Sequence, residues 1–196
     1  MKEKVVITGG MGRLGHELVN QLKEKYSILI IDSLLHKKLP NLPEGVNIST
    51  FDLSSKDWPA LLRSQLKNSK FVFHLAALTD PKESIKFPHQ YHDANVTSTV
   101  NILAASSTAE VEKIIFPSCY FNKGQFFTPF HSQKSICETY CKMFYKVYDL
   151  NTLSIRLPKT SQKKSLKSIS KFLIDSAEDG SLGCGSVIKY NQAKCE

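Results

Sequence analysis

The stretch Val5–Leu18, VVITGGMGRLGHEL, decides the fold of this chain. An apolar run stops at paired glycines, and apolar residues with helical spacing follow. Three glycines, Gly9, Gly12 and Gly15, have the spacing that lets a chain turn tightly, a phosphate approach the backbone and a helix pack closely on a sheet. The stretch therefore predicts a strand, a turn and a helix whose first amides bind the phosphates of a dinucleotide.

A carboxylate follows this unit at the distance expected for a dinucleotide site. Asp32 ends the next apolar run, SILIID, about 20 residues after the glycines, where it can hold a ribose 2′-hydroxyl. Its charge favours NAD, because it would repel the 2′-phosphate of NADP, whereas Arg13, Lys37 and Lys38 favour NADP by neutralising that phosphate. A tight strand–helix turn that binds nothing is the simpler alternative. The candidate cofactor-binding residues of this unit are Gly9, Gly12, Arg13, Leu14, Gly15 and Asp32.

Apolar runs and helical patterns alternate along the rest of the chain. Further strands are expected at 27–32, 46–54, 69–78, 111–120 and 152–158, and helices at 12–26, 55–67, 95–107, 131–150 and 165–180. Runs as apolar as SILIID suit a parallel sheet that is covered on both faces. The alternation predicts a doubly wound α/β fold whose parallel strands are joined by right-handed crossovers.

Composition narrows the class of protein. The chain has 196 residues, 41% of them hydrophobic, which suits one ordinary domain with a core. It shows no signal-peptide pattern and no apolar run near the roughly 20 residues of a spanning helix, so we expect no membrane partner. The five cysteines are odd in number and lack CxxC spacing, so we expect neither a disulfide framework nor a metal site, and hence a reducing compartment, the cytoplasm.

The formal charge of +8 raises the question of a nucleic-acid partner. Part of the excess lies in Lys159–Lys171, which contains no aromatic residue and no recognised nucleic-acid motif. We therefore expect a solvated, lysine-rich surface and no nucleic-acid partner.

Five motifs in order resemble the extended short-chain dehydrogenase/reductase family, the NAD-dependent sugar-nucleotide epimerases and dehydratases. TGGMGRLG resembles that family's TGxxGxxG, FDLS its third-strand Asp-Leu, VFHLAAL its HLAA, NVTSTVNILAA its NVxGTxNLLEA, and IRLP its Leu-Arg-x-Pro. The resemblance implies a Rossmann-type fold, an NAD(P) cofactor and a nucleotide-sugar substrate. It places two residues near the adenine and four more on the cofactor side, namely Asp52 and Leu53, and Leu75, Ala76, Ala77 and Asn95.

Simpler roles are open for three of the polar residues in these motifs. Asp52 fits a residue that caps a turn, and Asn95 fits a helix N-cap. His74 lies within an apolar strand, which is more typical of a packed core histidine than of a catalyst.

The proton-transfer group of the family is absent. Its chemistry uses a Ser or Thr after the fifth strand and a Tyr-x-x-x-Lys on the next helix, where the lysine lowers the pKa of the phenol that exchanges a proton with the substrate. In TPFHSQKSICE the resemblance places Lys134 at the lysine and Phe130 at the tyrosine. Counting back from Gly124 places Cys119 at the Ser/Thr position, and a shift of one residue places Ser118 there.

Three readings of this departure are open. The first is a chain that binds NAD(H) and catalyses poorly or not at all, because losing a positioned acid or base costs about 10²–10⁴-fold in rate; Lys134 would keep its family role at the nicotinamide ribose. The second is a working epimerase, dehydratase or oxidoreductase in which Cys119, Tyr120, Tyr140 or a partner chain supplies the proton. The third is a degraded or truncated reading frame with no robust activity.

The C-terminal part also departs from the family. After the sixth strand the family usually reads Asn-Val-Tyr-Gly-Pro and enters its substrate lobe, whereas this chain reads KTSQK. We expect residues 1–158 to form the NAD(P)-binding domain and 159–196 to be a basic remnant of the substrate lobe, in which SKFLIDSAEDG resembles the family's next helix. The substrate lobe would then be largely missing, which leaves little to hold the nucleotide end of a sugar nucleotide.

A homodimer is a further expectation from the resemblance. Many members pair through two helices that begin here near Asn95 and His131. A row of apolar residues on the second helix fits either an outward pairing face or plain packing on the sheet: Ile136, Tyr140, Met143, Phe144 and Val147.

Overall fold

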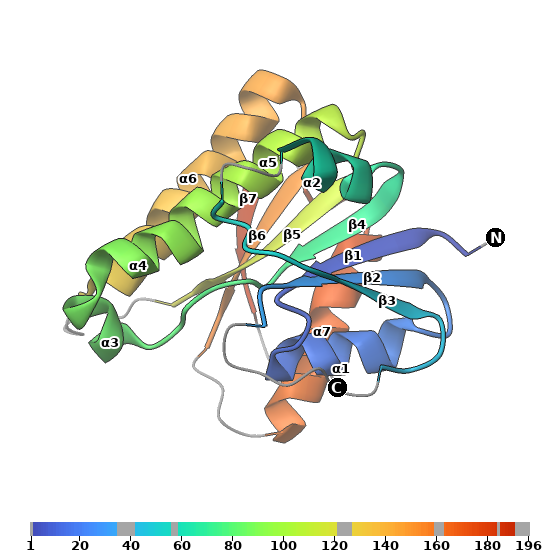
Figure 1. Ribbon diagram of the computed structural model, residues 1–196, viewed down its shortest axis with the longest axis horizontal. Helices are drawn as coiled ribbons and strands as arrows, with labels where there is room; N and C mark the ends of the chain where they lie inside the picture. The colour runs from blue at the N-terminus through green and yellow to red at the C-terminus, as the bar shows by residue number, and fades with distance from the viewer. Residues whose placement is uncertain are drawn as a thin grey trace.

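The computed structural model describes residues 2–34, 42–55, 59–120, 127–158, 163–183 and 185–190, which form one parallel sheet flanked by helices (Figure 1). Its strands are β1 Lys4–Thr8, β2 Ser27–Asp32, β3 Val46–Thr50, β4 Ser69–His74, β5 Lys113–Cys119, β6 Thr152–Leu157 and β7 Ser186–Lys189. They lie in the order β3-β2-β1-β4-β5-β6-β7, which confirms the doubly wound Rossmann-type fold. The strand order reverses between β1 and β4, and ligands of such sheets bind at the carboxyl ends of the strands there.

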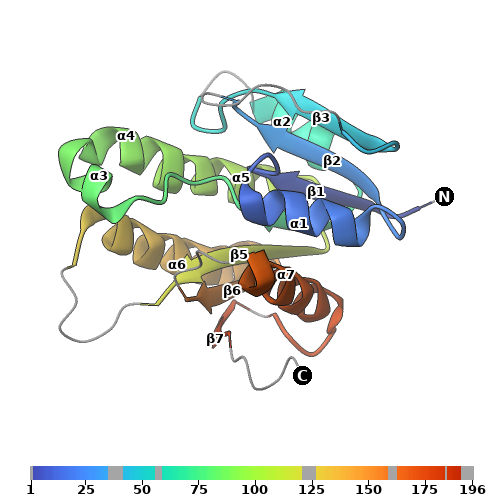
Figure 2. The same cartoon turned by 90° about the horizontal axis from the view of Figure 1, so that it is seen from below.

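The helices cover both faces of the sheet. They are α1 Arg13–Leu22, α2 Pro59–Leu66, α3 Pro81–Lys86, α4 Pro88–His92, the π-helix η1 Asp93–Thr97, α5 Ser98–Thr108, α6 Pro129–Tyr148 and α7 Lys163–Glu178. One core lies under α1 and α7 and contains Ile7 and Leu173, and a second core lies under α2, α5 and α6 and contains Val6 and Ile102 (Figure 2). Alternate residues of β1 enter opposite cores because successive side chains of a strand point to opposite faces.

Capping residues in the sequence determine where helix α6 begins and ends. Thr128 and His131 cap the first turn reciprocally, and Pro129 occupies the first helical position. At the other end Asp149 adopts a left-handed conformation with φ of 54°. The predicted helix 131–150 therefore begins two residues earlier and ends two residues earlier than expected.

Other elements also differ from the sequence prediction. β3 ends at Thr50, so the expected strand 46–54 is too long at its C-terminal end. Helical backbone begins at Pro88 and passes through η1 into α5, well before the expected start at residue 95. β7 was not predicted; it lies beyond Pro158 and pairs with β6.

The apolar row on α6 is divided between core and surface. Phe144 is buried and belongs to the second core, while Tyr140 and Met143 pack partly against that core. Ile136 and Val147 are exposed. Of the two alternatives, packing on the sheet therefore fits Phe144, and an outward face fits Ile136 and Val147.

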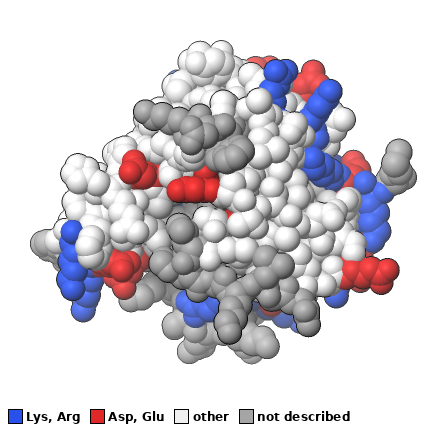
Figure 3. Space-filling model, in the orientation of Figure 1, with Lys and Arg blue, Asp and Glu red and all other residues white. Residues whose placement is uncertain are grey.

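The surface of the described residues carries charges of both signs. Figure 3 shows lysine and arginine side chains interspersed with acidic ones, with a broad uncharged area between them. Among the described helices, none combines the length and the apolar character that crossing a membrane would require. The described part of the chain also holds no cluster of three or more potential metal-ligating His, Cys, Asp or Glu residues.

Candidate cofactor site

The glycine turn lies at the carboxyl end of β1, beside the point where the strand order reverses. Gly9 has φ of +63°, and a Cβ there would lie 2.6 Å from the amide nitrogen of Ala76. A Cβ at Gly15 would lie 2.4 Å from the carbonyl oxygen of Gly10. Gly12 precedes α1 and provides no side-chain cap. The turn therefore needs glycine for conformation and space, and it leaves the first amides of α1 open to a ligand.

Asp32 connects the end of β2 to this turn. Its Oδ2 accepts a hydrogen bond from the Met11 amide at 3.0 Å, and its Oδ1 accepts one from the Leu34 amide at 3.0 Å. The side chain is 9% exposed. Because each carboxylate oxygen can accept more than one hydrogen bond, Asp32 can still bind hydroxyl groups. Arg13, at the start of α1, is exposed and Leu14 is half-buried, whereas Lys37 and Lys38 lie outside the described residues.

A buried chain of hydrogen bonds runs from β1 through His74 to α5. Thr8 Oγ1 accepts from the Ala76 amide at 3.2 Å and lies 2.7 Å from His74 Nδ1. On the other side His74 Nε2 lies 3.0 Å from Thr99 Oγ1, which donates to the Asn95 carbonyl at 2.5 Å. Because the Thr99 proton is used there, Thr99 must accept from His74. The proton of His74 therefore sits on Nε2, and its Nδ1 accepts from Thr8.

His74 is the packed core histidine that the sequence predicted, since it is 1% exposed. Burial lowers its pKa to about 3, and the charge of Lys134 acts in the same direction. The folded state therefore holds this ring neutral, with one donor and one acceptor already used.

This neutral histidine predicts a pH dependence of stability. The unfolded chain takes up the proton near pH 6.5, but the folded chain takes it up only near pH 3. Stability is therefore present above pH 6.5 and falls as the pH drops below it, by about 1.4 kcal/mol per pH unit from this group alone. We expect His74→Gln, which keeps a donor and an acceptor, to flatten the slope of urea-unfolding free energy between pH 6 and 4. An equal slope in both proteins would contradict this assignment.

Asn95 lies inside η1 and is not the helix N-cap that was one alternative. Its Oδ1 accepts from the Leu78 amide at 2.8 Å, and its Nδ2 donates to the Leu78 carbonyl and to Gln133 Oε1, both at 3.1 Å. Its side chain thus connects the segment after β4, which contains Leu75, Ala76 and Ala77, to α6. π-helical turns are often found at functional sites.

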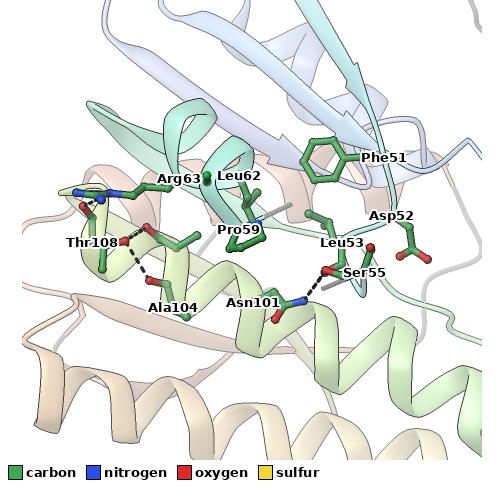
Figure 4. Close-up of a pocket in the computed structure, with 12 residues that line it drawn as sticks. Phe51, Asp52, Leu53, Ser55, Pro59, Leu62, Arg63, Asn101, Ala104 and Thr108 are labelled. Carbon is green, nitrogen blue, oxygen red and sulfur yellow. Dashed lines mark hydrogen bonds between the residues drawn. The ribbon is translucent and has the colours of Figure 1, made fainter. Parts of the chain in front are cut away.

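Asp52 and Leu53 lie in the loop that follows β3. Asp52 Oδ1 accepts from both the amide and the hydroxyl of Ser54 at 2.8 Å, so Asp52 does cap a turn. Leu53 is buried in the second core. A pocket of about 350 Å³ opens beside this loop, between α2 and α5 (Figure 4). Its lining includes Asp52, Leu53, Arg63 and Asn101.

Phe130 occupies the first turn of α6 and is held from two sides. Its amide donates to Ser84 Oγ at 3.2 Å, and its ring lies edge-on to His131 with 5.4 Å between ring centres. The side chain is 7% exposed and carries no group that can exchange a proton.

Lys134 lies one turn further along α6 and points at the end of β5. Its Nζ donates to the Pro117 carbonyl at 3.0 Å and lies 4.6 Å from the centre of the Phe116 ring. Burial lowers the pKa of Lys134. The ammonium is thus held by a carbonyl and an aromatic face in a site with little water.

Ser118 and Cys119 point to opposite faces of β5. Ser118 is paired in register with Arg156, which binds Glu138 of α6 at 2.6 Å, so Ser118 faces α6. Its hydroxyl is buried and has no hydrogen-bond partner among the described residues. Cys119 is a half-buried free thiol whose pKa is raised by burial, while the charge of Lys134 opposes that shift.

The two tyrosines considered as substitutes are engaged elsewhere. The Tyr120 hydroxyl donates to the Tyr190 carbonyl at 2.7 Å, beyond the end of β7. Tyr140 packs partly against the second core, nearly three turns of α6 beyond Phe130.

Some residues that shape this region were missed by sequence reasoning. Ser84 in α3 and Gln133 in α6 hold Phe130 and Asn95, and Thr8 and Thr99 hold His74. Their roles depend on contacts between distant segments. Thr8 and Thr99 do occupy the Thr positions of the family's TGxxGxxG and NVxGTxN patterns, and Asn101 occupies the last Asn, but the contacts that these residues make were not visible in the sequence.

Comparison with known proteins agrees with this geometry. The model of the "NAD dependent epimerase/dehydratase family" matches residues 5–161. A putative UDP-glucose 4-epimerase from Methanocaldococcus jannaschii is 25% identical over 167 residues, which cover 78% of this chain and 54% of that protein. The matched part of this chain thus spans about half the length of that relative.

Solved structures show the same arrangement. A UDP-N-acetylglucosamine 4-epimerase from Methanobrevibacter ruminantium, solved with UDP-N-acetylmuramic acid, superposes with a TM-score of 0.81 at 26% identity, covering 97% of this chain and 77% of that one. A UDP-glucose 4-epimerase from Thermus thermophilus, solved with NAD, superposes with a TM-score of 0.69 at 26% identity, covering 78% and 54%.

Proposed function

Because this chain belongs to the NAD-dependent epimerase/dehydratase family, we propose that it binds NAD(H) at the carboxyl ends of β1 and β4 and that it does not catalyse sugar epimerisation by a tyrosine route. The observation that carries the proposal is the pairing of an intact glycine turn with Phe130 at the position of the proton-transfer tyrosine. The cofactor-binding part comprises residues 1–158.

The phosphates of the cofactor would lie against the first turn of α1. The amides after Gly12 have no side-chain cap, and the start of a helix carries partial positive charge. Asp32, already oriented by the Met11 amide, would accept the ribose hydroxyls and disfavour the 2′-phosphate of NADP. These features support NAD over NADP.

The nicotinamide end would lie near Lys134 and Phe130. Nicotinamide supplies or accepts hydride when it is bound. This chain's own residues would bind and orient it there: Lys134 offers its remaining ammonium protons to the ribose, and Ser118 offers a hydroxyl that has no described partner. Phe130 would exclude water from that end without exchanging a proton.

A nucleotide-sugar is the ligand class that we propose beside the cofactor. The support is the family and the UDP-sugars named for two relatives. The alternative of a working enzyme that uses Cys119 or Tyr120 is weakened by the raised pKa of the thiol and by the hydrogen bond of the Tyr120 hydroxyl to Tyr190. A second copy of the chain on α5 and α6 would cover Ile136 and Val147, both exposed.

Restoring the phenol tests the proposal. We expect Phe130→Tyr to place a hydroxyl on the helical face of Lys134, because positions i and i+4 are neighbours. Epimerisation of UDP-glucose in the presence of NAD⁺, followed by NMR, should rise by about 10²–10⁴-fold from a rate near background. Affinity for NADH should change by less than about threefold, because the uncharged ring is kept.

Phe127→Tyr is the matched control. Phe127 is 49% exposed and lies before α6, so its new phenol lacks the i, i+4 relation to Lys134. It should leave the background rate unchanged. Rapid epimerisation by the unmodified chain would contradict the proposed lack of catalysis.

A further inference from the structure

The loop after β3 has little backbone support of its own. β3 is the edge strand of the sheet, and its pairing with β2 ends at Thr50. The next residues, 51–55, have no neighbouring strand to bind their amides and carbonyls. Within the loop, Asp52 binds Ser54 and the Ser55 amide donates to the Asp52 carbonyl at 3.2 Å. These bonds shape the turn but do not attach it to the rest of the molecule.

Asn101 supplies a polar attachment from α5. Its Nδ2 donates to the Leu53 carbonyl at 2.8 Å and to the Ser55 carbonyl at 3.4 Å. Figure 4 shows the Asn101 amide directed toward this loop, with a dashed line for its bond to the Leu53 carbonyl. The neighbouring residues Ile102 and Leu103 are 0% and 1% exposed, so the helix that carries Asn101 is firmly packed.

The attached loop presents an unused donor and acceptor side by side. Asp52 Oδ1 is occupied by Ser54, whereas Oδ2 of Asp52 and the amide of Leu53 have no hydrogen bond among the described residues. A carboxylate oxygen next to an amide N–H is complementary to the amino group and ring nitrogen on the Watson–Crick edge of adenine. The positions of the Asp52 carboxylate and the Leu53 amide depend on where Asn101 holds the Leu53 carbonyl.

We propose that Asn101 is a positioning residue for the adenine of the cofactor: it fixes the Asp52–Ser55 loop so that Asp52 and the Leu53 amide read the base edge. This inference rests on the proposed binding of NAD(H). Asn101 acts through the loop and does not touch the cofactor itself.

The test compares two coenzymes that differ only at that edge. Reduced nicotinamide hypoxanthine dinucleotide carries a carbonyl where NADH carries the amino group, so it offers Asp52 an acceptor in place of a donor. We expect the unmodified chain to bind NADH about 10-fold or more tightly than the hypoxanthine analogue, measured by fluorescence titration. Asn101→Ala and the same-sized Asn101→Asp, which both remove the two N–H donors, should reduce that ratio to about twofold or less.

Arg63→Ala is the matched control. Arg63 lines the same pocket, and its Nε donates to the Thr108 carbonyl at 3.1 Å, at the far end from the loop (Figure 4). The variant removes one bond between α2 and α5 without touching residues 51–55. A general loosening of the two helices would affect both variants, whereas the proposed role predicts an unchanged coenzyme ratio in Arg63→Ala.

The outcomes separate the inference from the function on which it rests. If the unmodified chain binds neither coenzyme, the proposed function fails. If it binds NADH and the Asn101 variants keep the full ratio, the role of Asn101 is overturned while the function stands. If neither Asn101 variant folds while Arg63→Ala does, the proposed role of Asn101 is also overturned. Asn101 would then be needed for the stability of the whole domain and not specifically for the position of the loop.

Discussion

Gly15→Val is expected to lower the free energy of unfolding by about 3 kcal/mol and to abolish measurable NADH binding. A Cβ at residue 15 would lie 2.4 Å from the Gly10 carbonyl oxygen, and the atoms it meets are backbone, which cannot rotate away. Helix α1 would have to move off the glycine turn. Its first amides would then lose the position that a phosphate group requires. Urea unfolding and fluorescence titration measure the two effects.

Gly180→Ala is the control for this substitution. A Cβ at Gly180 has nothing within 4 Å, so stability should stay within about 0.5 kcal/mol and NADH binding should be unchanged. A Gly15→Val protein that unfolds and binds NADH like the original would show that close contact at this glycine is not needed.

Asp32→Ala is expected to weaken NADH binding by about 10–100-fold and NADPH binding much less. The carboxylate that is lost binds the ribose hydroxyls of NADH but repels the 2′-phosphate of NADPH. The substitution also leaves the Met11 and Leu34 amides without their acceptor, which costs about 1–3 kcal/mol of stability. Calorimetric titration with both coenzymes measures the change in preference.

Asp175→Ala controls for loss of a surface carboxylate. Asp175 is exposed and pairs with Lys171 one helical turn earlier, and such pairs contribute little. Both coenzymes should bind it as they bind the original chain. An equal loss of NADH and NADPH affinity in Asp32→Ala would mean that Asp32 only supports the turn and does not select the cofactor.

The opening strand, turn and helix were predictable because their requirements are local. The glycines at 9, 12 and 15 are needed within one short stretch, and the apolar runs around them specify buried parallel strands. The position of Asp32 followed from the same spacing. At these positions the residue pattern directly reflects the local backbone and packing requirements, so the sequence alone was sufficient to predict the strand, the turn and the helix.

β7 and η1 could not be predicted in the same way. β7 is the four-residue run SVIK, and so short an alternation of buried and less buried residues is too weak a pattern to predict a strand. The strand forms because β6 has an edge with which it can pair. η1 lies in a continuous helical run, and its wider turn is associated with the bonds that Asn95 makes to Leu78 and Gln133. Both depend on partners far along the chain.

The sequence named individual residues of the candidate site, but it did not predict the hydrogen bonds between them. The sequence placed Lys134 and Phe130 on one helical face, yet it gave no sign that Lys134 binds the Pro117 carbonyl or that Ser84 holds the Phe130 amide. It also left Ser118 and Cys119 as alternatives. The pleat of β5 separates them, because Ser118 shares a face with Arg156 and α6.

The most direct measurement is a calorimetric titration of the unmodified chain with NAD⁺ and NADH, paired with its melting temperature in each. One molecule of coenzyme per chain should bind, and a concentration of 100 times the Kd should stabilise the fold by about 2.7 kcal/mol. Absence of heat and an unchanged melting temperature with both coenzymes would contradict the account.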